Sequence, residues 1–466
     1  MPKKMYLCLQ SFKMDMERLP LLKNTTRTSS VDAEDRRSKF LGPSHLHENY
    51  EPHLHRQVDH PTSNLDTIIH LLKSNIGTGI LTMPQAFKYA GLYLGLFGTF
   101  FMGFIATHCM HMFLASANEL CRRRTVPSMD YSETCYSAFS TGPPRLRKFA
   151  PHAKYITNTF LVLSQMGFCC VYYLFVAKNL QDVGNYYYGP IDVRYYLVVL
   201  LIPLIMLNFL KNLKILAPVS LFASILTVIS LVIVFYYILH DIPSTKHVPK
   251  VGSLSELPLF FGIVIYSFEG IGIVLPLENN MRTPKAFDGL TGVMNTGMVI
   301  IAALYAAIGF FGYLKYGDCV AATITLNLDR SSIVAESVRV MFAIAIFFSY
   351  SLQFYIPMKI IGPWYRQLFS EQRQNLYDGL LRIGLIVLTF IFAAVVPKLG
   401  PIISLFGAVF SSSLALIFPP VVEVLTFGSK GMGRFHWKLL KNMAIITFGI
   451  YGFVLGAYLS ILDLMK

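Results

Sequence analysis

Two apolar segments of membrane length in this chain are each interrupted near the middle by a short glycine-containing stretch. The first, residues 65–90, is interrupted at 75–79 (NIGTG), and the second, residues 257–277, at 267–272 (SFEGIG). Each glycine destabilises a helix by about 1 kcal/mol relative to alanine, and the carboxyl group of Glu269 is costly at the centre of a membrane segment. We therefore predict two broken membrane helices, although a glycine can also simply permit close helix packing.

Composition places the chain among membrane proteins. Hydrophobic residues make up 54% of its 466 residues, charged residues 14%, and the mean hydropathy is +0.51. A helix needs about 20 residues to cross the hydrocarbon, and only helices and closed barrels satisfy their backbone groups there. Because the apolar runs have helix length, we predict an all-α polytopic membrane protein. Its eleven predicted transmembrane helices are residues 65–90, 92–120, 155–180, 195–210, 215–239, 257–277, 290–314, 333–358, 380–396, 400–425 and 442–463.

The first ten predicted helices divide into two halves of five, so that one interrupted segment stands first in each half. Transporters built from inverted repeats carry interrupted helices at corresponding positions, and these interruptions point to the binding site. The matched breaks therefore predict a 5+5 inverted repeat with broken helices 1 and 6.

Basic residues are concentrated in one set of alternate loops, for example at Arg122, Arg123 and Arg124, and the formal net charge is +14. Such loops are cytosolic in membrane proteins. We therefore predict a cytosolic amino terminus and, after eleven spans, an extracellular or lumenal carboxyl terminus. The positive charge indicates orientation and attraction to membrane lipid, and it predicts no nucleic acid partner.

Residues 1–64 are polar and rich in Ser, Thr, His and Pro, which is typical of a disordered tail. We predict a disordered cytosolic tail at 1–64 that contributes nothing to the fold, followed by a transporter domain at 65–466. Glu17, Leu21 and Leu22 match an acidic dileucine signal, which predicts a trafficking adaptor as a partner. The expected location is the plasma membrane or an endosome or lysosome.

Two predicted cytosolic loops could carry short helices. The longer loop, residues 122–151, has a candidate surface helix at 129–139, and residues 360–378 resemble a connector with another. Neither loop is long enough to predict a separate domain.

Peptide groups at a helix break lose their intrahelical partners and become available to a ligand. The N–H groups of Gly77, Thr78 and Gly79 could receive a carboxylate, because a helix amino terminus attracts anions. Carbonyl groups near Asn75 and Ile76 in the first break, and at Ser267 and Phe268 in the second, could accept an ammonium group. The predicted substrate site therefore consists of Asn75, Ile76, Gly77, Thr78, Gly79, Ser267, Phe268, Glu269 and Gly270.

Two residues are candidates for proton coupling. Glu269 could neutralise the substrate ammonium, bind a proton, or pair with a buried donor. His70 lies five residues before the first break, and its unperturbed pKa of about 6.5 suits proton exchange, although Lys73 one turn later disfavours the charged imidazole. Protons are the only coupling species expected, and no cofactor is predicted.

Several other polar side chains lie in the apolar segments. Aromatic and amide residues of the third and eighth spans could line the site or pack in the core, namely Tyr172, Tyr173, Tyr350, Gln353 and Tyr355. His108 and His111 share a helix face but lack a third ligand, so no metal site is predicted. The absence of a phosphate-binding loop, a nucleophile elbow and a metalloprotease motif predicts that the chain is not an enzyme.

Residues 70–79 (HLLKSNIGTG), followed by Met83-Pro84, resemble the first span of the proton-coupled amino acid transporters within the amino acid/auxin permease group. Further similarities extend to the end of the chain: 107–110 (THCM), 165–172 (QMGFCCVY), 268–272 (FEGIG), 275–279 (LPLEN), 325–328 (TLNL) and 353–357 (QFYIP). The resemblance implies eleven spans in a LeuT-like fold and symport of small neutral amino acids, such as glycine, alanine and proline, with protons by alternating access. It also implies that His70 takes part in proton coupling.

The sequence departs from this family in two respects. Members commonly carry a disulfide between the loops after spans three and seven, but residues 182–194 contain no cysteine, which leaves Cys319 without that partner. Ser74 and Thr82-Met83 stand where many members have Gly and Gly-Leu, which leaves pocket size and substrate choice open. Two alternatives to a proton symporter are an amino acid sensor that signals through the cytosolic tail and a sodium-coupled amino acid carrier.

Overall fold

The computed structural model describes residues 50–58, 61–209, 213–367, 369, 373–428 and 436–465. The chain divides into two units, residues 1–50 and 51–466, and the second contains all the helices treated below. Most of the predicted tail, with the adaptor motif at Glu17, Leu21 and Leu22, lies outside the described residues.

The regular elements in the described part of the second unit are all helices, apart from one isolated bridge between Thr62 and Met281. Its α-helices are α4 (Asn64–Asn75), α5 (Thr78–Ala90), α6 (Leu92–Arg124), α7 (Tyr131–Thr141), α8 (Ala150–Tyr188), α9 (Val193–Asn208), α10 (Leu213–Leu239), α11 (Leu257–Ser267), α12 (Ile271–Asn279), α13 (Val293–Tyr316), α14 (Ile333–Arg366), α15 (Gln374–Val395), α16 (Leu399–Phe406), α17 (Phe418–Phe427) and α18 (Trp437–Met465). This arrangement confirms the all-α fold.

Each predicted apolar segment coincides with one helix or with a group of consecutive helices. Among the described residues, nine helical stretches are long and apolar enough to cross a membrane, and α9 is a shorter apolar helix. The fold class of a polytopic membrane protein is therefore confirmed, whereas the number of eleven crossings stays a prediction.

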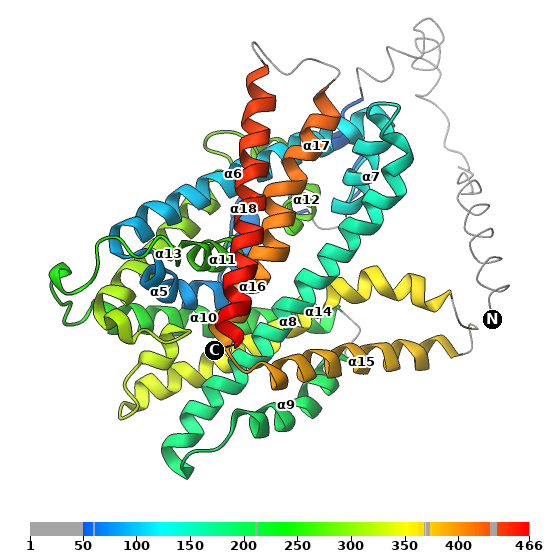
Figure 1. Ribbon diagram of the computed structural model, residues 1–466. Coiled ribbons are helices and arrows are strands. Elements are labelled where there is room, and N and C mark those ends of the chain that lie inside the picture. The colour runs from blue at the N-terminus through cyan, green and yellow to red at the C-terminus, as the bar shows by residue number, and fades with distance from the viewer. Residues whose placement is uncertain are drawn as a thin grey trace, which may run out of the picture. The chain divides into compact units, whose positions relative to one another are not determined.

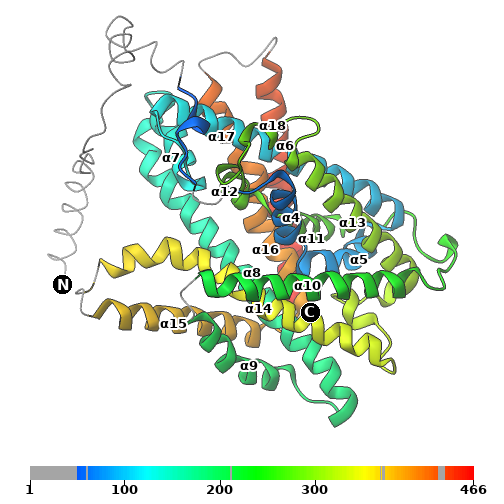
Figure 2. The ribbon, with the colours of Figure 1, turned by 180° about the vertical axis from the view of Figure 1, so that it is seen from behind.

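Both predicted helix breaks are present. The first apolar segment is α4 followed by α5, with Ile76 and Gly77 between them, and the second is α11 followed by α12, with residues 268–270 between them. All residues of α11 after Leu257 are buried. Figure 2 shows α4, α5 and α11 among the surrounding helices, with α10 in front of them. The breaks therefore lie in the interior of the helical unit.

The tenth apolar segment is also irregular, which the sequence did not indicate. Between α16 and α17 the backbone forms two π-helical turns, Gly407–Ser411 and Ser413–Ile417. A Cβ atom at Gly407 would lie 1.9 Å from the carbonyl oxygen of Gly262 in α11, so this position tolerates no side chain. α16 runs beside α18 (Figure 1). The π turns therefore lie directly against the first half of the second broken helix.

The two predicted short helices have different outcomes. A helix is present near 129–139 as α7, but it is largely buried against α8 and α17 and is not a surface helix. The prediction of a separate helix in residues 360–378 is wrong for the described residues, because α14 continues to Arg366 and α15 begins at Gln374. Arg366 forms a salt bridge with Asp378 of 2.6 Å, which ties the two helix ends together.

Residues 51–58 and 61–64 contact the helices, so the prediction that the tail contributes nothing to the fold up to residue 64 is corrected here. The N–H of Thr62 donates to Asn280 O, and the N–H of Arg282 donates to Thr62 O. Arg56 forms a 2.7 Å salt bridge with Glu278 at the end of α12. We call residues 51–58, 61 and 62 the amino-terminal strap.

Ion pairs join the two predicted outer loops that the family disulfide would link. Asp182 near the end of α8 lies 2.6 Å from Arg330 Nη2, in the loop after α13, and 2.9 Å from Arg339 Nε in α14. Cys319 is exposed and unpaired. In this chain the contact between these two segments is therefore electrostatic.

Candidate functional site

The two helix breaks contact each other directly. A Cβ atom at Gly79 would lie 2.8 Å from Ser267 Cα, and one at Gly270 would lie 3.1 Å from Asn75 Nδ2. Only glycine allows this approach at Gly79, because the neighbouring atom belongs to the backbone. The structure thus brings Asn75, Gly79, Ser267 and Gly270 together, as the predicted site requires.

Each second half-helix begins at a glycine. Gly77 caps α5 and Gly270 caps α12, and neither cap supplies a side-chain acceptor for the N–H groups of the first turn. These N–H groups carry the partial positive charge of a helix amino terminus. Both termini can therefore donate hydrogen bonds to an anionic group, which is the property predicted for Gly77, Thr78 and Gly79.

The hydroxyl of Tyr305 in α13 lies between the two breaks. It is 2.6 Å from Asn75 O and 2.7 Å from Ser267 O, the carbonyls that end α4 and α11. A hydroxyl has one hydrogen and can donate to only one of them at a time. Asn75 Nδ2 donates to Leu71 O, while the buried Asn75 Oδ1 has no partner among the described residues. Asn75 O also accepts from the N–H of Gly77 at 3.0 Å. Among the described residues, Asn75 Oδ1 therefore remains without a donor, and Ser267 O shares the Tyr305 hydrogen with Asn75 O.

Aromatic side chains surround this group of acceptors. The Tyr266 hydroxyl forms a 3.1 Å hydrogen bond with Thr78 Oγ1. Tyr172 OH would lie 2.9 Å from a Cβ atom at Gly77, and it accepts a hydrogen bond from Gln353 Nε2 at 3.2 Å. These contacts leave little room for a large ligand side chain next to Gly77.

Phe268 closes the same region from the second break. Its side chain is fully buried, and its ring centroid is 4.9 Å from that of Tyr305. A Cβ atom at Gly103 of α6 would lie 3.0 Å from the Phe268 ring. The Phe268 ring is therefore closely packed between α6 and α13.

The Glu269 carboxylate accepts hydrogen bonds from two serines. Ser164 Oγ of α8 donates to Oε1 at 2.7 Å, and the Ser411 hydroxyl donates to Oε2. Ser411 ends the first π turn, and π turns are frequent at functional sites. The partly buried Glu269 thus joins the second break to α8 and to the π-helical segment.

His70 is not part of this cluster. Its side chain is exposed on α4, on the far side of Asn75, five residues before the end of the helix. Ile76 is partly buried, and its N–H donates to Leu72 O.

Only some of the candidate lining residues reach the breaks. Tyr172 and Gln353 do, as described above. Tyr173 donates its hydroxyl to Leu197 O, Tyr350 bonds to Thr389 Oγ1, and Tyr355 is exposed. Of the two interpretations, core packing therefore holds for Tyr173 and Tyr350, which are buried with their hydroxyls engaged away from the breaks.

Sequence reasoning missed four residues of the site: Tyr266, Tyr305, Ser164 and Ser411. Each is a polar residue in an apolar segment, and such residues are too frequent here to be selected individually. A buried carboxylate needs hydroxyl or amide donors, so the position of Glu269 could have prompted a search for serines. Nothing in the sequence could have identified which ones.

The two histidines of α6 have partners other than a metal. His111 Nδ1 lies 2.6 Å from Asp288 Oδ1, and its Nε2 lies 2.7 Å from Asn295 Oδ1. This hydrogen bond from His111 is the main reason that the pKa of Asp288 is lowered. His108 Nε2 is 3.0 Å from Lys441 Nζ. No group of three metal-binding side chains occurs among the residues the structure describes.

The geometry can be compared with known proteins. The sequence model of the family described as "Transmembrane amino acid transporter protein" matches residues 60–462. The chain belongs to this family. The match covers both helix breaks and the segments that carry Ser164, Tyr305 and Ser411, so the whole site lies within the matched residues.

Two curated relatives support membership of this family. The chain is 38% identical over 419 residues to the "Proton-coupled amino acid transporter-like protein pathetic" of Drosophila melanogaster, which covers 90% of this chain and 88% of the relative. It is 26% identical over 407 residues to the "Probable amino acid transporter skat-1" of Caenorhabditis elegans, with 84% and 88% covered. Both relatives are named as transporters and not as enzymes.

Among solved structures, MhsT in complex with L-phenylalanine aligns with 88% of this chain and 98% of its own. The TM-score is 0.41 and the sequence identity is 12%.

Proposed function

We propose that this family member is a secondary active transporter that carries small neutral amino acids together with protons by alternating access. The observation that carries the proposal is the Tyr305 hydroxyl, which lies within hydrogen-bond distance of Asn75 O and Ser267 O at once. An ammonium group has three N–H donors and can satisfy both carbonyls and Asn75 Oδ1. The substrate ammonium therefore replaces Tyr305 as the donor at this point.

The carboxylate of the same substrate binds at the other side of the break. The uncapped first turn of α5, which begins at Gly77, offers backbone N–H donors and a positive helix end. Thr78 Oγ1, held by Tyr266, lies in this first turn. A zwitterion with a small side chain thus meets donors and acceptors of the correct kind at each end.

The side chains that surround the site limit the size of the substrate. Tyr172 lies against Gly77, Ser267 lies against Gly79, and the fully buried Phe268 closes the region beside Tyr305. A pocket enclosed in this way favours glycine, alanine or proline over larger amino acids.

Glu269 is the group proposed to carry the coupled proton at the break, since it is partly buried and, among the described residues, its carboxylate accepts hydrogen bonds from two serines. His70 is retained as the second candidate, at a position on α4 that precedes the break. Protons are the proposed coupling ion. The proposed location is the plasma membrane or an endosome or lysosome, with a cytosolic amino terminus.

Uptake into proteoliposomes tests the proposal. We expect uptake of glycine, alanine and proline to rise when the outside is acidified, and to be unchanged when sodium is replaced by choline. Uptake that is independent of the pH gradient but requires sodium would show that transport is coupled to sodium and not to protons. Saturable binding without uptake would favour the alternative of an amino acid sensor that signals through the cytosolic tail.

A further inference from the structure

Three consecutive serines, residues 411–413, lie in the π-helical segment between α16 and α17, and their hydroxyls differ in what they bind. The hydroxyls of Ser412 and Ser413 each donate to the carbonyl four residues earlier, within the same segment. The Ser411 hydroxyl instead donates to Glu269 Oε2. Of the three serine hydroxyls, that of Ser411 therefore connects the tenth apolar segment to the second break.

Glu269 receives its other hydrogen bond from a different helix. Ser164 Oγ of α8 donates to Oε1 at 2.7 Å, and both serines are buried. Among the described residues, no basic side chain forms an ion pair with Glu269. The titratable side chains close enough to interact with its charge are Tyr131 of α7 and Tyr266 of α11, and tyrosine is neutral at physiological pH. The charged carboxylate is therefore stabilised by the two serine hydroxyls, because a donated hydrogen bond favours the charged form.

A proton on Glu269 changes the hydrogen bonds that these hydroxyls can make. A carboxylate only accepts hydrogen bonds, whereas a carboxylic acid also donates one through its own O–H. If the acid donates to Ser411, the single hydrogen of Ser411 must turn to another acceptor. Gly407 O lies four residues earlier, which is the kind of partner that Ser412 and Ser413 already have. The bond to Glu269 is then a neutral one and roughly half as strong as a bond to the charged carboxylate.

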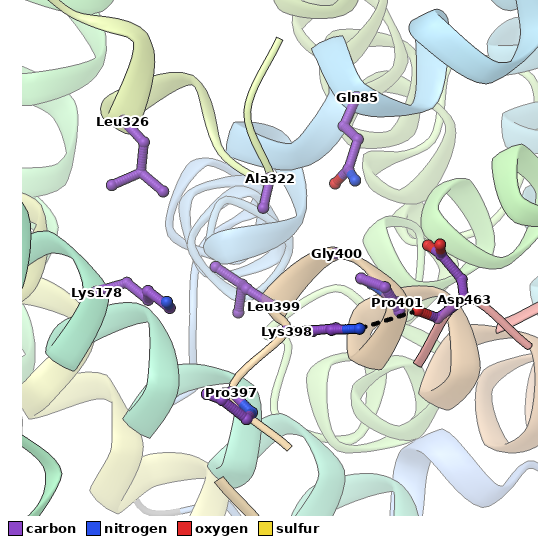
Figure 3. Close-up of a pocket in the computed structure, with 10 residues that line it drawn as sticks. All are labelled: Gln85, Lys178, Ala322, Leu326, Pro397, Lys398, Leu399, Gly400, Pro401 and Asp463. Carbon is purple, nitrogen blue, oxygen red and sulfur yellow. Dashed lines mark hydrogen bonds between the residues drawn. The ribbon is translucent and has the colours of Figure 1, made fainter. Parts of the chain in front are cut away.

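The segment that carries Ser411 has features that allow it to move. Its two π turns depart from the hydrogen-bond pattern of an α-helix, and they pack against α11. Residues 397–401, which lead into and begin α16, line a pocket of about 420 Å³ (Figure 3). The tenth apolar segment therefore borders a cavity at its start, while Ser411 holds its middle to the second break.

We infer that Ser164 and Ser411 are positioning residues for proton coupling, and that Ser411 transmits the protonation state of Glu269 to the π-helical segment. The charged carboxylate holds this segment against the second break, and the neutral acid loosens it. This inference rests on the proposed function, in which Glu269 carries the coupled proton. It adds to that function two side chains and the segment that responds to the proton.

The test measures alanine uptake into proteoliposomes of the full-length chain at a series of external pH values and one internal pH. Ser411→Ala removes a donor to the charged carboxylate, and such a hydrogen bond corresponds to about one to two pH units. We expect the external pH of half-maximal uptake to rise by about this amount, while exchange of internal for external alanine continues. Ser164→Ala should shift the profile in the same direction. Ser411→Thr, which keeps the hydroxyl, should retain the native profile.

Ser413→Ala is the matched control, because Ser413 is buried in the same segment and its Oγ donates to Val409 O at 2.7 Å and not to Glu269. It should keep the native pH profile. Identical profiles for Ser411→Ala, Ser413→Ala and a native protein that responds to pH would overturn the inference and leave proton-coupled transport in place. Native uptake that is independent of pH would overturn both proposals.

Hydrogen exchange of residues 407–417 provides a second measurement, which does not require Ser411→Ala to be active. Glu269→Gln is permanently neutral at this position, so the π-helical segment should exchange faster in this variant than in the native protein at the alkaline end of the pH profile. Residues 437–465 of α18 serve as the internal reference and should exchange at the same rate in both. Equal exchange of residues 407–417 in the two proteins would contradict a link between the charge of Glu269 and the π-helical segment.

Discussion

Arg56 Nη1 lies 2.7 Å from Glu278 Oε2, and the two side chains are only 6% and 2% exposed. Arg56 belongs to the amino-terminal strap directly before α4, and Glu278 is near the end of α12. This buried pair therefore joins the start of the first broken helix to the second half of the other. Arg56 Nε also donates to Pro127 O at 2.9 Å, which connects the strap to the segment after α6.

Arg56→Gln should destabilise the protein strongly. Removing one partner leaves the other charge buried and unpaired, which costs about 3–5 kcal/mol. The expected result is a clear fall in the melting temperature of the purified protein. Arg282→Gln is the control, since this exposed arginine is in the same region and only its backbone N–H contacts the strap. The double change Arg56→Met with Glu278→Leu should recover stability, and equal melting temperatures for Arg56→Gln and Arg282→Gln would contradict the role of the pair.

Acidification should loosen the same strap through His53. Its Nδ1 lies 3.4 Å from Glu278 Oε1, yet the pKa of His53 is lowered, chiefly by burial and then by the positive charges of Arg56 and Lys285, with Glu51 acting in the opposite direction. The folded protein therefore binds fewer protons here than the unfolded chain does. Stability is then lost as the pH falls through about 6.5, the ordinary value for histidine. His53→Gln should flatten the dependence of the melting temperature on pH between 7 and 5, and an unchanged slope would exclude His53 as the cause.

The sequence was sufficient for the fold class and for both helix breaks, because apolar length and glycine position are local properties. It was not sufficient for the contacts between distant helices. Tyr305, from α13, reaches both breaks only because α13 packs against α4 and α5. The π turn that carries Ser411 has no reliable sequence signal either. The strap was misjudged because its polar composition is typical of disorder, whereas Arg56 finds a buried partner far along the chain.

On the predicted outer side, the ion pairs of Asp182 with Arg330 and Arg339 should hold together the two segments that the family disulfide would link. Arg339 is fully buried and depends on Asp182, so Asp182→Asn should cost about 3–5 kcal/mol by leaving a buried charge without its counter-ion. Arg330 is 60% exposed, and Arg330→Gln should cost at most about 1 kcal/mol. Melting temperatures of the two variants in the same detergent give the comparison. Equal losses would mean that the buried pair contributes no more than the exposed one.

Tyr305→Phe should make the stability of the protein depend more strongly on bound substrate. Without the hydroxyl, Ser267 O loses this donor and Asn75 O keeps only the N–H of Gly77, at a cost of about 1–3 kcal/mol in the empty protein. A bound ammonium group restores the hydrogen bonds, so the rise in melting temperature on adding alanine should be larger than in the native protein. Tyr313→Phe is the control on the same helix, because Tyr313 is buried and its hydroxyl makes no hydrogen bond to another described residue. A smaller rise in Tyr305→Phe would show that the hydroxyl binds the substrate and does not substitute for it.

Glu269→Gln should separate substrate binding from proton coupling. Glutamine keeps the shape of the side chain and an acceptor for Ser164, but it cannot gain or lose a proton. We therefore expect the variant to exchange internal for external alanine while it fails to accumulate alanine under an acid-outside gradient. His70 is exposed and apart from the breaks, so His70→Gln should keep a measurable response to the gradient. Only the group that gains and loses a proton during the transport cycle can link alanine movement to pH. If accumulation is retained in Glu269→Gln and lost in His70→Gln, His70 and not Glu269 carries the coupled proton.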